Sequence, residues 1–357
     1  MKVLHLCPLW FPVARDSPGG IETYLPTLLP ELDRLGCDNT LLASAESAGD
    51  WKLIPVVERN VWEGMEDGTV WDYAHYEQHQ LLLALEYGAD FDVVHSHIGA
   101  PAFVLAGVPA VRDRLLHTQH TPVTRDVEWF VSRRPGLRFS TVSEFQARKL
   151  RAQGADACDA IPNGIDMSTF DFQSIRQGDE LLYIGRMEQQ KGPDIAARVA
   201  RALGRRLTLA GPMTDREFFD AKIAPLLDDR VRYVGAVDHA RKNELLGAAA
   251  CLLMPSRWEE PFGLIAVEAM ACGTPVVALR GGALPEAVEH GVSGIVADDE
   301  NALAAGVAAA TQLNRHEVRR RAERRFDIQD VAREYVDLYG RVAQDALAAR
   351  PPQSAEA

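Results

Sequence analysis

Short, nearly continuous apolar runs recur along the chain, and between them apolar residues repeat every three or four positions. The runs are typical of strands buried on both faces of a parallel sheet, and the longer repeats are typical of amphipathic helices that cover it. In the first half the pattern predicts strands over residues 3–7, 40–43, 91–97, 115–120, 138–142 and 157–161. It predicts helices most clearly over residues 20–35, 75–87 and 144–152. This alternation indicates a doubly wound α/β domain.

The alternation begins again after Pro162-Asn163-Gly164, a strong turn signal at which we place the domain boundary. Strands are predicted over residues 181–184, 207–210, 231–234, 251–254, 275–278 and 294–296. A long amphipathic helix is expected over residues 326–349, and residues 350–357 should form a flexible tail. We therefore expect one domain from residues 1–162 with 326–349 and a second from residues 163–325. A chain of 357 residues is long enough for two hydrophobic cores.

Composition and charge argue against some classes of binding partner and say less about the fold. The chain is 47% hydrophobic and 25% charged, which is ordinary for a soluble globular protein. Its net charge of −13 argues against non-specific binding of nucleic acid. The first 165 residues alone carry −8, which argues against a face that binds an anionic membrane. The arginine-rich stretch over residues 319–325 is interpreted as a solvated helix face.

Three features favour the cytoplasm. The chain has no run of about 18 apolar residues, so we expect no integral membrane segment. Its first residues lack a cleavage site and are better interpreted as a strand than as a signal peptide. The five cysteines are odd in number, scattered and without metal-ligand spacing, which favours reduced thiols.

The most informative residues are two carboxylates, Glu260 and Glu268, which follow the apolar run that ends near Pro255. A loop should carry Glu260, and a helix that begins near Gly263 should carry Glu268. The carboxyl edge of a parallel sheet is where α/β proteins bind nucleotides. There the carboxylates would bind hydroxyls, and the free N–H groups of the helix start would bind an anion. Two solvated helix glutamates are the simpler alternative.

Other residues suit a diphosphate. Gly19-Gly20 precedes a helix, where glycine lets the backbone approach an anion. Arg186 and Lys191 follow a predicted strand and would clamp a pyrophosphate, the first through its planar fork and the second as a point charge. A salt bridge within the loop is the alternative. Gly281-Gly282 offers a further close approach of the backbone.

Four histidines lie at predicted strand ends, namely His95, His97, His117 and His120. His95 and His97 suggest a metal pair, but no third ligand appears in a fitting context, so no metal is expected. His120 is placed to hydrogen-bond a sugar hydroxyl or the backbone. His97 is a lesser candidate for the same role.

An ordered set of short motifs spans residues 1 to about 340. Its members are Gly19-Gly20-Ile21-Glu22, the strand end at His120, Val142-Ser143-Glu144, Ile161-Pro162-Asn163-Gly164-Ile165-Asp166, Gly185-Arg186, Lys191-Gly192, Glu260-Pro261-Phe262-Gly263-Leu264 with Glu268, Gly273-Thr274-Pro275-Val276-Val277, and Gly281-Gly282 with Pro285-Glu286. Together they resemble the retaining glycosyltransferases of family 4. The resemblance implies the GT-B fold: two doubly wound Rossmann-like domains that face each other across a cleft, with a C-terminal helix that crosses back to the N-terminal domain.

The resemblance also implies roles for the catalytic and donor-binding residues. Glu268 would hydrogen-bond the ribose, and Glu260 would lie near the transferred sugar. Arg186 and Lys191 would neutralise the departing diphosphate, and His120 would contact a sugar hydroxyl. The rest of the nucleotide site would comprise Gly19, Gly20, Val234, Phe262, Gly263 and Leu264.

The implied reaction moves a sugar from a nucleoside-diphosphate sugar to a hydroxyl of a soluble acceptor, either a small molecule or a sugar chain. UDP is favoured and GDP is second, on family frequency alone. Retention of configuration follows from the resemblance. No cofactor is expected, and no metal, since no Asp-x-Asp motif stands in a fitting place. The alternatives are a sugar-nucleotide epimerase of the same fold and a non-catalytic nucleotide-sugar-binding protein.

The segment over residues 51–76 matches no motif of the family. It carries five aromatic residues, namely Trp51, Trp62, Trp71, Tyr73 and Tyr76. We hypothesise that this segment lines the acceptor site together with Trp10. The alternative is that these rings pack the surface of their own domain.

Overall fold

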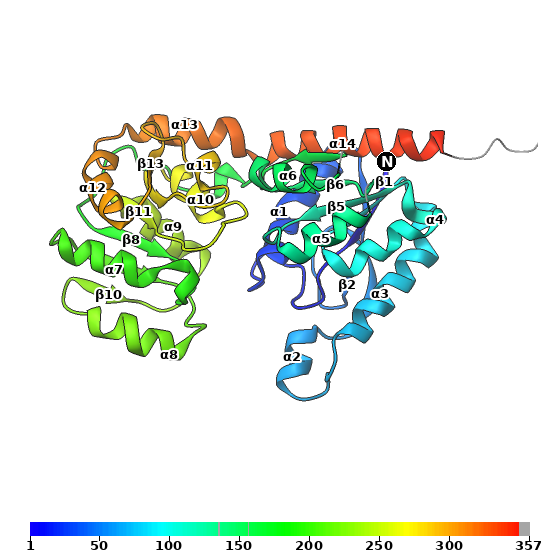
Figure 1. Cartoon of the computed structure of the whole chain (residues 1–357), viewed down its shortest axis with the longest axis horizontal. Coiled ribbons are helices and arrows are strands. Elements are labelled where there is room, and N and C mark those ends of the chain that lie inside the picture. Colours follow the sequence, from blue (N-terminus) through cyan, green and yellow to red (C-terminus); the bar gives the residue numbers. More distant parts are fainter. Residues whose placement is uncertain (135, 156, 350–357) are drawn as a thin grey trace, which may run out of the picture. The chain divides into compact units, whose positions relative to one another are not determined.

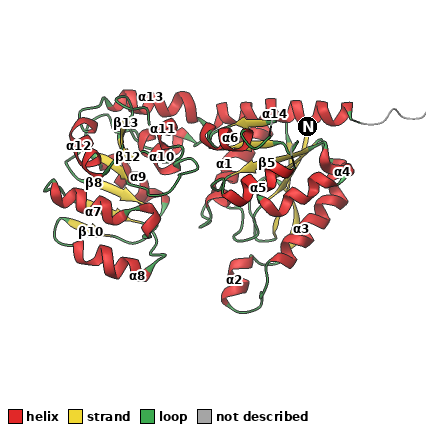
Figure 2. Ribbon diagram, in the orientation of Figure 1, coloured by secondary structure: helices red, strands yellow, loops and turns green. Residues whose placement is uncertain are grey.

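The computed structural model describes residues 1–134, 136–155 and 157–349 (Figure 1). The tail expected at residues 350–357 lies outside the described residues. The chain forms two compact units: unit 1 is residues 1–164 with the C-terminal segment from Ile328, and unit 2 is Ile165–Asp327. Each unit has its own parallel sheet, with helices along it (Figure 2).

The sheet of unit 1 has seven parallel strands in the order β3-β2-β1-β4-β5-β6-β7. These strands are β1 Lys2–Leu6, β2 Asp38–Ser44, β3 Lys52–Val57, β4 Val93–Ser96, β5 Leu115–Gln119, β6 Phe139–Thr141 and β7 Cys158–Ala160. The helices of this unit are α1 Gly20–Arg34, α2 Val61–Glu66, α3 Ala74–Tyr87, α4 Pro109–Arg112, α5 Arg125–Arg133, α6 Glu144–Arg151 and α14 Ile328–Ala348. The strand order reverses between β1 and β4, which makes this the topological switch point of the sheet.

One strand, β3, is not in the sequence prediction. It pairs with β2 along one edge of the sheet and contains Pro55. Proline cannot donate a backbone hydrogen bond, so within sheets it is confined to edges, strand starts and bulges. The proline and the half-buried side chains around it hide the strand from a search for continuous apolar runs.

Helices α1 and α14 share one hydrophobic cluster with β1. Apolar residues three or four apart on α1, such as Leu25, Leu28 and Leu32, are fully buried there. Tyr335 and Tyr339 of α14 are equally buried in the same cluster. The C-terminal helix therefore belongs to the core of unit 1, although it follows unit 2 in the sequence.

The long helix was predicted over residues 326–349, and the predicted start is wrong. Phe326 ends a separate helix, α13, and Asp327 has extended backbone before α14 begins at Ile328. An added Cβ at Gly164 would lie 2.8 Å from the Cα atom of Ile328. The chain passes from one unit to the other after Gly164 and again before Ile328, and these two segments lie close together. The helix is interrupted at the second of them.

The sheet of unit 2 has six parallel strands in the order β10-β9-β8-β11-β12-β13. These strands are β8 Leu181–Ile184, β9 Leu207–Ala210, β10 Val231–Tyr233, β11 Cys251–Met254, β12 Val276–Leu279 and β13 Gly294–Ala297. The helices of this unit are α7 Pro193–Ala202, α8 Arg216–Phe218, α9 His239–Ala248, α10 Leu264–Ala271, α11 Leu284–Ala287, α12 Glu300–Ala310 and α13 Arg315–Phe326. The strand order reverses between β8 and β11, so the segments after these two strands flank the switch point.

All five cysteines are buried free thiols, as the sequence predicts. Among the described helices, none combines the length and the apolar character that crossing a bilayer needs.

Candidate active site

Two charged residues meet at the switch point of unit 2. Lys191 follows β8, Glu260 follows β11, and the Nζ atom of Lys191 lies 2.7 Å from Oε1 of Glu260. Ser256 donates its hydroxyl to the same oxygen at 2.8 Å. Glu260 is only 5% exposed, and the Lys191 ammonium lies 4.2 Å from the centroid of the Trp258 ring. The site is thus a buried carboxylate beside a cation that rests on an aromatic face. Ser256 and Trp258 were not predicted from the sequence, although both lie between β11 and Glu260.

The loops that carry this pair are tied to each other. Arg257 forms two hydrogen bonds with the carboxylate of Asp194, at 2.7 and 2.6 Å, and Asp194 is 4% exposed. Gly192 has a φ of +72°, and a Cβ there would lie 2.2 Å from the carbonyl oxygen of Pro255. Glycine has no Cβ and therefore permits this close contact between Gly192 and Pro255. As a result, the segment after β8 can pack directly against the end of β11. Lys191 is therefore held beside Glu260 by its backbone as well as by its charge.

Gly282 fixes the backbone of Glu260. It has a φ of +56°, and an added Cβ would lie 2.2 Å from the Glu260 carbonyl oxygen and 2.4 Å from its nitrogen. The N–H group of Ala283 donates to the same carbonyl at 2.8 Å. Gly281-Gly282, which was expected to let the backbone approach a phosphate, thus has a structural role in this unit, because it packs against the loop that carries Glu260.

We expect Gly282→Ala to displace Glu260, lowering kcat at least tenfold and stability by about 1–3 kcal/mol, the typical energy of a strained backbone position. Gly204→Ala is the matched control, since Gly204 has a similar φ of +63° but its nearest contact is an arginine nitrogen at 3.6 Å. The control variant therefore has the same strained backbone conformation, but its added Cβ makes no close contact. Steady-state kinetics and urea unfolding of both variants measure the effects, and equal losses of kcat in the two would contradict this role of Gly282.

Glu268 lies in α10 and is 7% exposed. Its Oε1 atom accepts a hydrogen bond from Nζ of Lys242, on α9, at 2.6 Å. No local sequence signal marks Lys242, because it lies 26 residues away on another helix. Among the described residues no side chain caps the start of α10, where Gly263 has a left-handed φ of +98°. The free N–H groups of this helix start remain available to a ligand.

The structure distributes the remaining expected donor-site residues around this edge. Arg186 is about half exposed and forms an ion pair with Glu188 at 2.9 Å, so the two proposed phosphate clamps contact different carboxylates. Phe262 is buried, with its ring centroid 5.5 Å from that of Phe326. Leu264 is half-buried, and Val234 is 44% exposed directly after the edge strand β10.

At the start of α1, the protein's own carboxylate occupies the position that an anion was expected to take. A Cβ on Gly19 would lie 2.1 Å from Oε2 of Glu22, so this side chain folds back over the glycine. Burial raises the pKa of Glu22, and hydrogen bonds from the backbone N–H groups of Glu22, Ile21 and Phe11 oppose that rise. An added Cβ on Gly20 would meet nothing within 4 Å. The helix start is therefore already charge-compensated, while Gly20 leaves an open approach beside it.

The third member of a histidine cluster, missed in the sequence, is His5. Ring nitrogens of His5, His95 and His97 lie within 4.8 Å of one another, and all three residues are buried. Every one of these nitrogens has a hydrogen-bond partner: Asn39 and His97 for His5, Tyr339 and Thr118 for His95, His5 and His120 for His97. A metal would have to replace these bonds, so the cluster is better described as a hydrogen-bonded network.

The aromatic segment divides into packed and exposed rings. Trp51 packs against the core of unit 1, whereas Trp62 is 45% and Trp71 is 92% exposed. Trp62 lies 5.7 Å from the Phe11 ring and Tyr73 lies 4.8 Å from the Trp10 ring, between centroids. The alternative of simple surface packing therefore holds for Trp51, while Trp71 stays available to a ligand.

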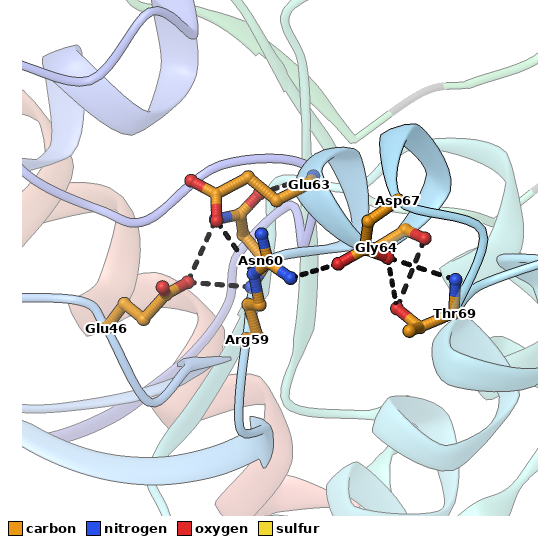
Figure 3. A network of polar contacts seen from close by, with 7 residues as sticks. All are labelled: Glu46, Arg59, Asn60, Glu63, Gly64, Asp67 and Thr69. Carbon is orange, nitrogen blue, oxygen red and sulfur yellow. Dashed lines mark hydrogen bonds and ion pairs between the residues drawn. The ribbon is translucent and has the colours of Figure 1, made fainter.

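Polar contacts hold the segment around α2, which carries Trp62 (Figure 3). Asn60 donates its backbone and side-chain N–H groups to Glu46 at 2.7 and 2.9 Å, and its own Oδ1 caps α2 by accepting from the Glu63 N–H group at 3.0 Å. Arg59 pairs with both Glu63 and Asp67. These contacts hold the start of α2, the helix that carries Trp62.

The arginine-rich stretch on α13 is not simply a solvated face. Arg319 donates to the carbonyl oxygens of Met167, Phe170 and Ala271, and Arg321 pairs with Glu289. The side chains of both arginines are less than a fifth exposed. Helix α13 packs against α10, and the bond from Arg319 to Ala271 joins it to the helix that carries Glu268.

Known protein families match a large part of the chain. Residues 178–312 match the family described as Glycosyl transferases group 1, and residues 18–169 match Glycosyltransferase Family 4. The chain is 29% identical over 359 residues to the D-inositol 3-phosphate glycosyltransferase of Pseudarthrobacter chlorophenolicus, with 84% of this chain and 83% of that protein aligned. It is 33% identical over 285 residues to the glycogen synthase of Mycobacterium tuberculosis, with 70% and 68% aligned.

Solved structures are similar over nearly the whole chain. AviGT4, a glycosyltransferase involved in avilamycin A biosynthesis, superposes with a TM-score of 0.73 at 26% identity and covers 96% of this chain and 98% of its own. Sucrose-phosphate synthase from Thermosynechococcus elongatus superposes with a TM-score of 0.78 and covers 98% and 100%. At 20% identity this second likeness bears on the fold alone.

Proposed function

This chain belongs to glycosyltransferase family 4 and has the GT-B fold of two Rossmann-like domains, and we propose that it transfers a sugar with retention of configuration from a nucleoside-diphosphate sugar to a hydroxyl of a soluble acceptor. The observation that carries the proposal is the buried Lys191–Glu260 pair at the switch point of unit 2, beside the uncapped start of α10. A cation, a carboxylate and free helix N–H groups are the parts that a sugar diphosphate needs.

The leaving diphosphate makes the largest electrostatic demand on the site. In the proposal, the Lys191 ammonium exchanges part of its contact with Glu260 for a phosphate oxygen as charge develops there. Arg186 adds a second cation from the same loop, and the α10 N–H groups add their dipoles. Glu268 binds the ribose hydroxyls as an acceptor already oriented by Lys242.

The reaction centre needs no covalent intermediate in this proposal. Glu260 already accepts two hydrogen bonds at Oε1, so its role is to orient sugar hydroxyls and to stabilise positive charge at the anomeric carbon. The acceptor hydroxyl attacks from the face that the diphosphate leaves, and the leaving phosphate takes its proton. Intact-mass detection of a glycosylated Glu260 would contradict this mechanism. We further propose that the reaction requires no metal, and activity should persist in EDTA.

The acceptor in the proposal is a polyol or sugar hydroxyl. The names of the relatives describe transfer to inositol phosphate and synthesis of glycogen, and the exposed Trp62 and Trp71 offer apolar faces for a sugar ring. UDP is the favoured donor nucleotide and GDP the second. The five reduced, buried cysteines support a cytoplasmic site of action.

Thermal shift of the purified protein against UDP, GDP, ADP, TDP and their common sugars, without added metal, tests the donor assignment. A ligand at 100 times its Kd should add about 2.7 kcal/mol, which raises the Tm by some degrees. Lys191→Met should abolish the shift for the diphosphates, whereas Lys222→Met, an exposed lysine of the same unit, should retain it. Failure of every nucleotide to stabilise the wild-type protein would contradict the diphosphate site.

Release of free nucleoside diphosphate then separates the alternatives. A transferase releases it in step with acceptor glycosylation, whereas an epimerase converts the donor without releasing it. A non-catalytic binding protein shows the thermal shift and no turnover. The anomeric configuration of the product, measured by NMR, decides between retention and inversion.

Replacing Trp71 by Ala should raise the acceptor KM about tenfold, the value of one stacked ring contact, and leave the donor KM unchanged. The reason is that Trp71 is almost fully exposed, so the change removes little packing. Trp51→Phe, at a packed position of the same segment, is the control. An unchanged acceptor KM in folded Trp71→Ala would remove this ring from the acceptor site.

A further inference from the structure

Four polar side chains form one continuous chain of hydrogen bonds across four neighbouring strands of unit 1. Asn39 lies on β2, His5 on β1, His97 directly after β4 and His120 directly after β5. Nε2 of His5 is 2.9 Å from Oδ1 of Asn39, and Nδ1 of His5 is 3.2 Å from Nε2 of His97. Nδ1 of His97 is in turn 3.0 Å from Nε2 of His120. The chain begins at a buried amide and ends at a half-buried ring.

The register of the sheet produces this diagonal. Asn39 pairs with Val3 and His5 with His95, so each step moves one strand across and two residues further along. Side chains two apart on a strand share a face, which keeps all the members on one side of the sheet. Because β1 and β4 are neighbours at the switch point, the chain leads to the carboxyl edge, where such folds bind ligands.

The amide of Asn39 sets the direction of the chain. Its Nδ2 donates to Oδ1 of Asp33 at 2.7 Å and points to the carbonyl oxygen of Leu29 at 3.5 Å. A carbonyl oxygen only accepts, so the amide nitrogen lies on that side and Oδ1 faces His5. His5 must therefore donate its Nε2–H to Asn39.

Each imidazole of the chain is neutral. Burial lowers the pKa of His5 and of His120 to about 4, and it lowers the pKa of His97 well below its usual value. A neutral imidazole has one N–H and one lone pair. With Nε2–H of His5 committed to Asn39, its Nδ1 accepts from Nε2–H of His97, whose Nδ1 accepts from Nε2–H of His120.

We propose that Asn39, His5 and His97 are positioning residues that hold His120 in the tautomer with an unprotonated Nδ1, and that this nitrogen accepts a hydrogen bond from a hydroxyl of the bound substrate. Nδ1 of His120 has no partner among the described residues, and it stands on the side of the ring away from His97. The tautomer follows from the hydrogen bonds between neutral, buried rings, whereas its use by a substrate hydroxyl rests on the proposed function.

The test is NMR of the full chain with ¹⁵N-labelled histidine at neutral pH, in which two-bond ¹H–¹⁵N correlations distinguish the tautomers. We expect the Nε2–H form for His5, His97 and His120. His97→Leu removes both the donor and the acceptor in the middle of the chain, so His120 should become a mixture of tautomers. His97→Gln retains a donor and an acceptor, and it should restore the single tautomer at His120.

Kinetics of the same pair adds the functional readout. We expect kcat/KM to fall about tenfold in His97→Leu, the value of one neutral hydrogen bond, and to recover in His97→Gln. An Nδ1–H form of His120 in the wild-type protein, or an unchanged tautomer in His97→Leu, would overturn the inference. If His97→Leu does not fold, His5→Leu and His5→Gln test the same inference at the preceding member of the hydrogen-bonded chain. Wild-type tautomers as expected in a protein that turns over no nucleotide sugar would support the positioning chain and contradict the proposed function.

Discussion

Replacing Lys191 by Met should lower kcat by a factor of about 10² to 10³, equivalent to about 3–4 kcal/mol, because a preorganised charge beside the developing diphosphate is lost. The measurement is steady-state turnover with the nucleotide sugar that stabilises the wild-type protein. Lys222→Met, which changes an exposed lysine of the same unit, should leave kcat unchanged. A folded Lys191→Met enzyme with near wild-type kcat would contradict the assignment of Lys191 to the diphosphate.

The structure adds a second effect of the same substitution, because Lys191 is also the ionic partner of buried Glu260. Removing the ammonium leaves the carboxylate with Ser256, at a cost to stability on the order of 2 kcal/mol. This is below the 3–5 kcal/mol of a fully buried broken pair, since a fifth of the Lys191 side chain is exposed. Adding Glu260→Gln should restore most of the stability but not the activity. Urea unfolding and kinetics of the double variant thus separate the structural role of the pair from its catalytic role.

The largest effect on stability is expected at Arg315, which is 6% exposed on α13. Its guanidinium donates to a set of buried oxygens, namely the carbonyls of Gln173, Gly247, Ala249 and Cys272 and the hydroxyl of Thr274, over 2.6 to 3.3 Å. Met has a similar length but no donor. Each buried oxygen left without a donor costs about 1–3 kcal/mol, so Arg315→Met should destabilise unit 2 by on the order of 3–5 kcal/mol.

Arg320→Met is the matched control on the same helix, since Arg320 is exposed and pairs with Glu317, its neighbour on α13. Such surface pairs contribute about 0–1 kcal/mol. Urea unfolding should therefore separate the two variants by several kcal/mol. Equal unfolding free energies would show that the oxygens around Arg315 find other donors. Because the carbonyl of Cys272 follows the end of α10, we also expect Arg315→Met to weaken nucleotide binding at Glu268.

The sequence was most informative where one periodicity had a single interpretation. Strands β8, β9 and β11 coincide with their predicted bounds, because fully buried parallel strands are continuous apolar runs. β3 was missed, since an edge strand with Pro55 lacks that pattern. The helix over residues 326–349 began too early because the apolar repeat continues through the break at Asp327.

The candidate site divides in the same way. Glu260, Lys191 and Gly263 stand next to strand ends and glycines, so local patterns placed them at the correct sheet edge. Lys242, Ser256, Asn39 and His5 were missed as partners of the site residues. Each is joined to its partner by a hydrogen bond whose geometry depends on how strands and helices pack. Arg319 was predicted to be exposed to solvent. Helical periodicity does not reveal that a backbone carbonyl at the end of a neighbouring helix accepts a hydrogen bond from its side chain.

The sequence by itself determined the alternation of strands and helices, the two-domain organisation that this implies, and the candidate residues for a diphosphate site, since these follow from hydrophobic periodicity and from glycine placement along the chain. Tertiary structure alone decided which distant charges pair, namely Lys191 with Glu260 and Lys242 with Glu268, whereas the pair of Arg186 and Glu188 is the salt bridge within the loop that the sequence left open. The physical reason is that pairing depends on distances set by strand order and register. Those distances join residues far apart in the sequence, such as His5 and His97, and a local pattern does not contain them.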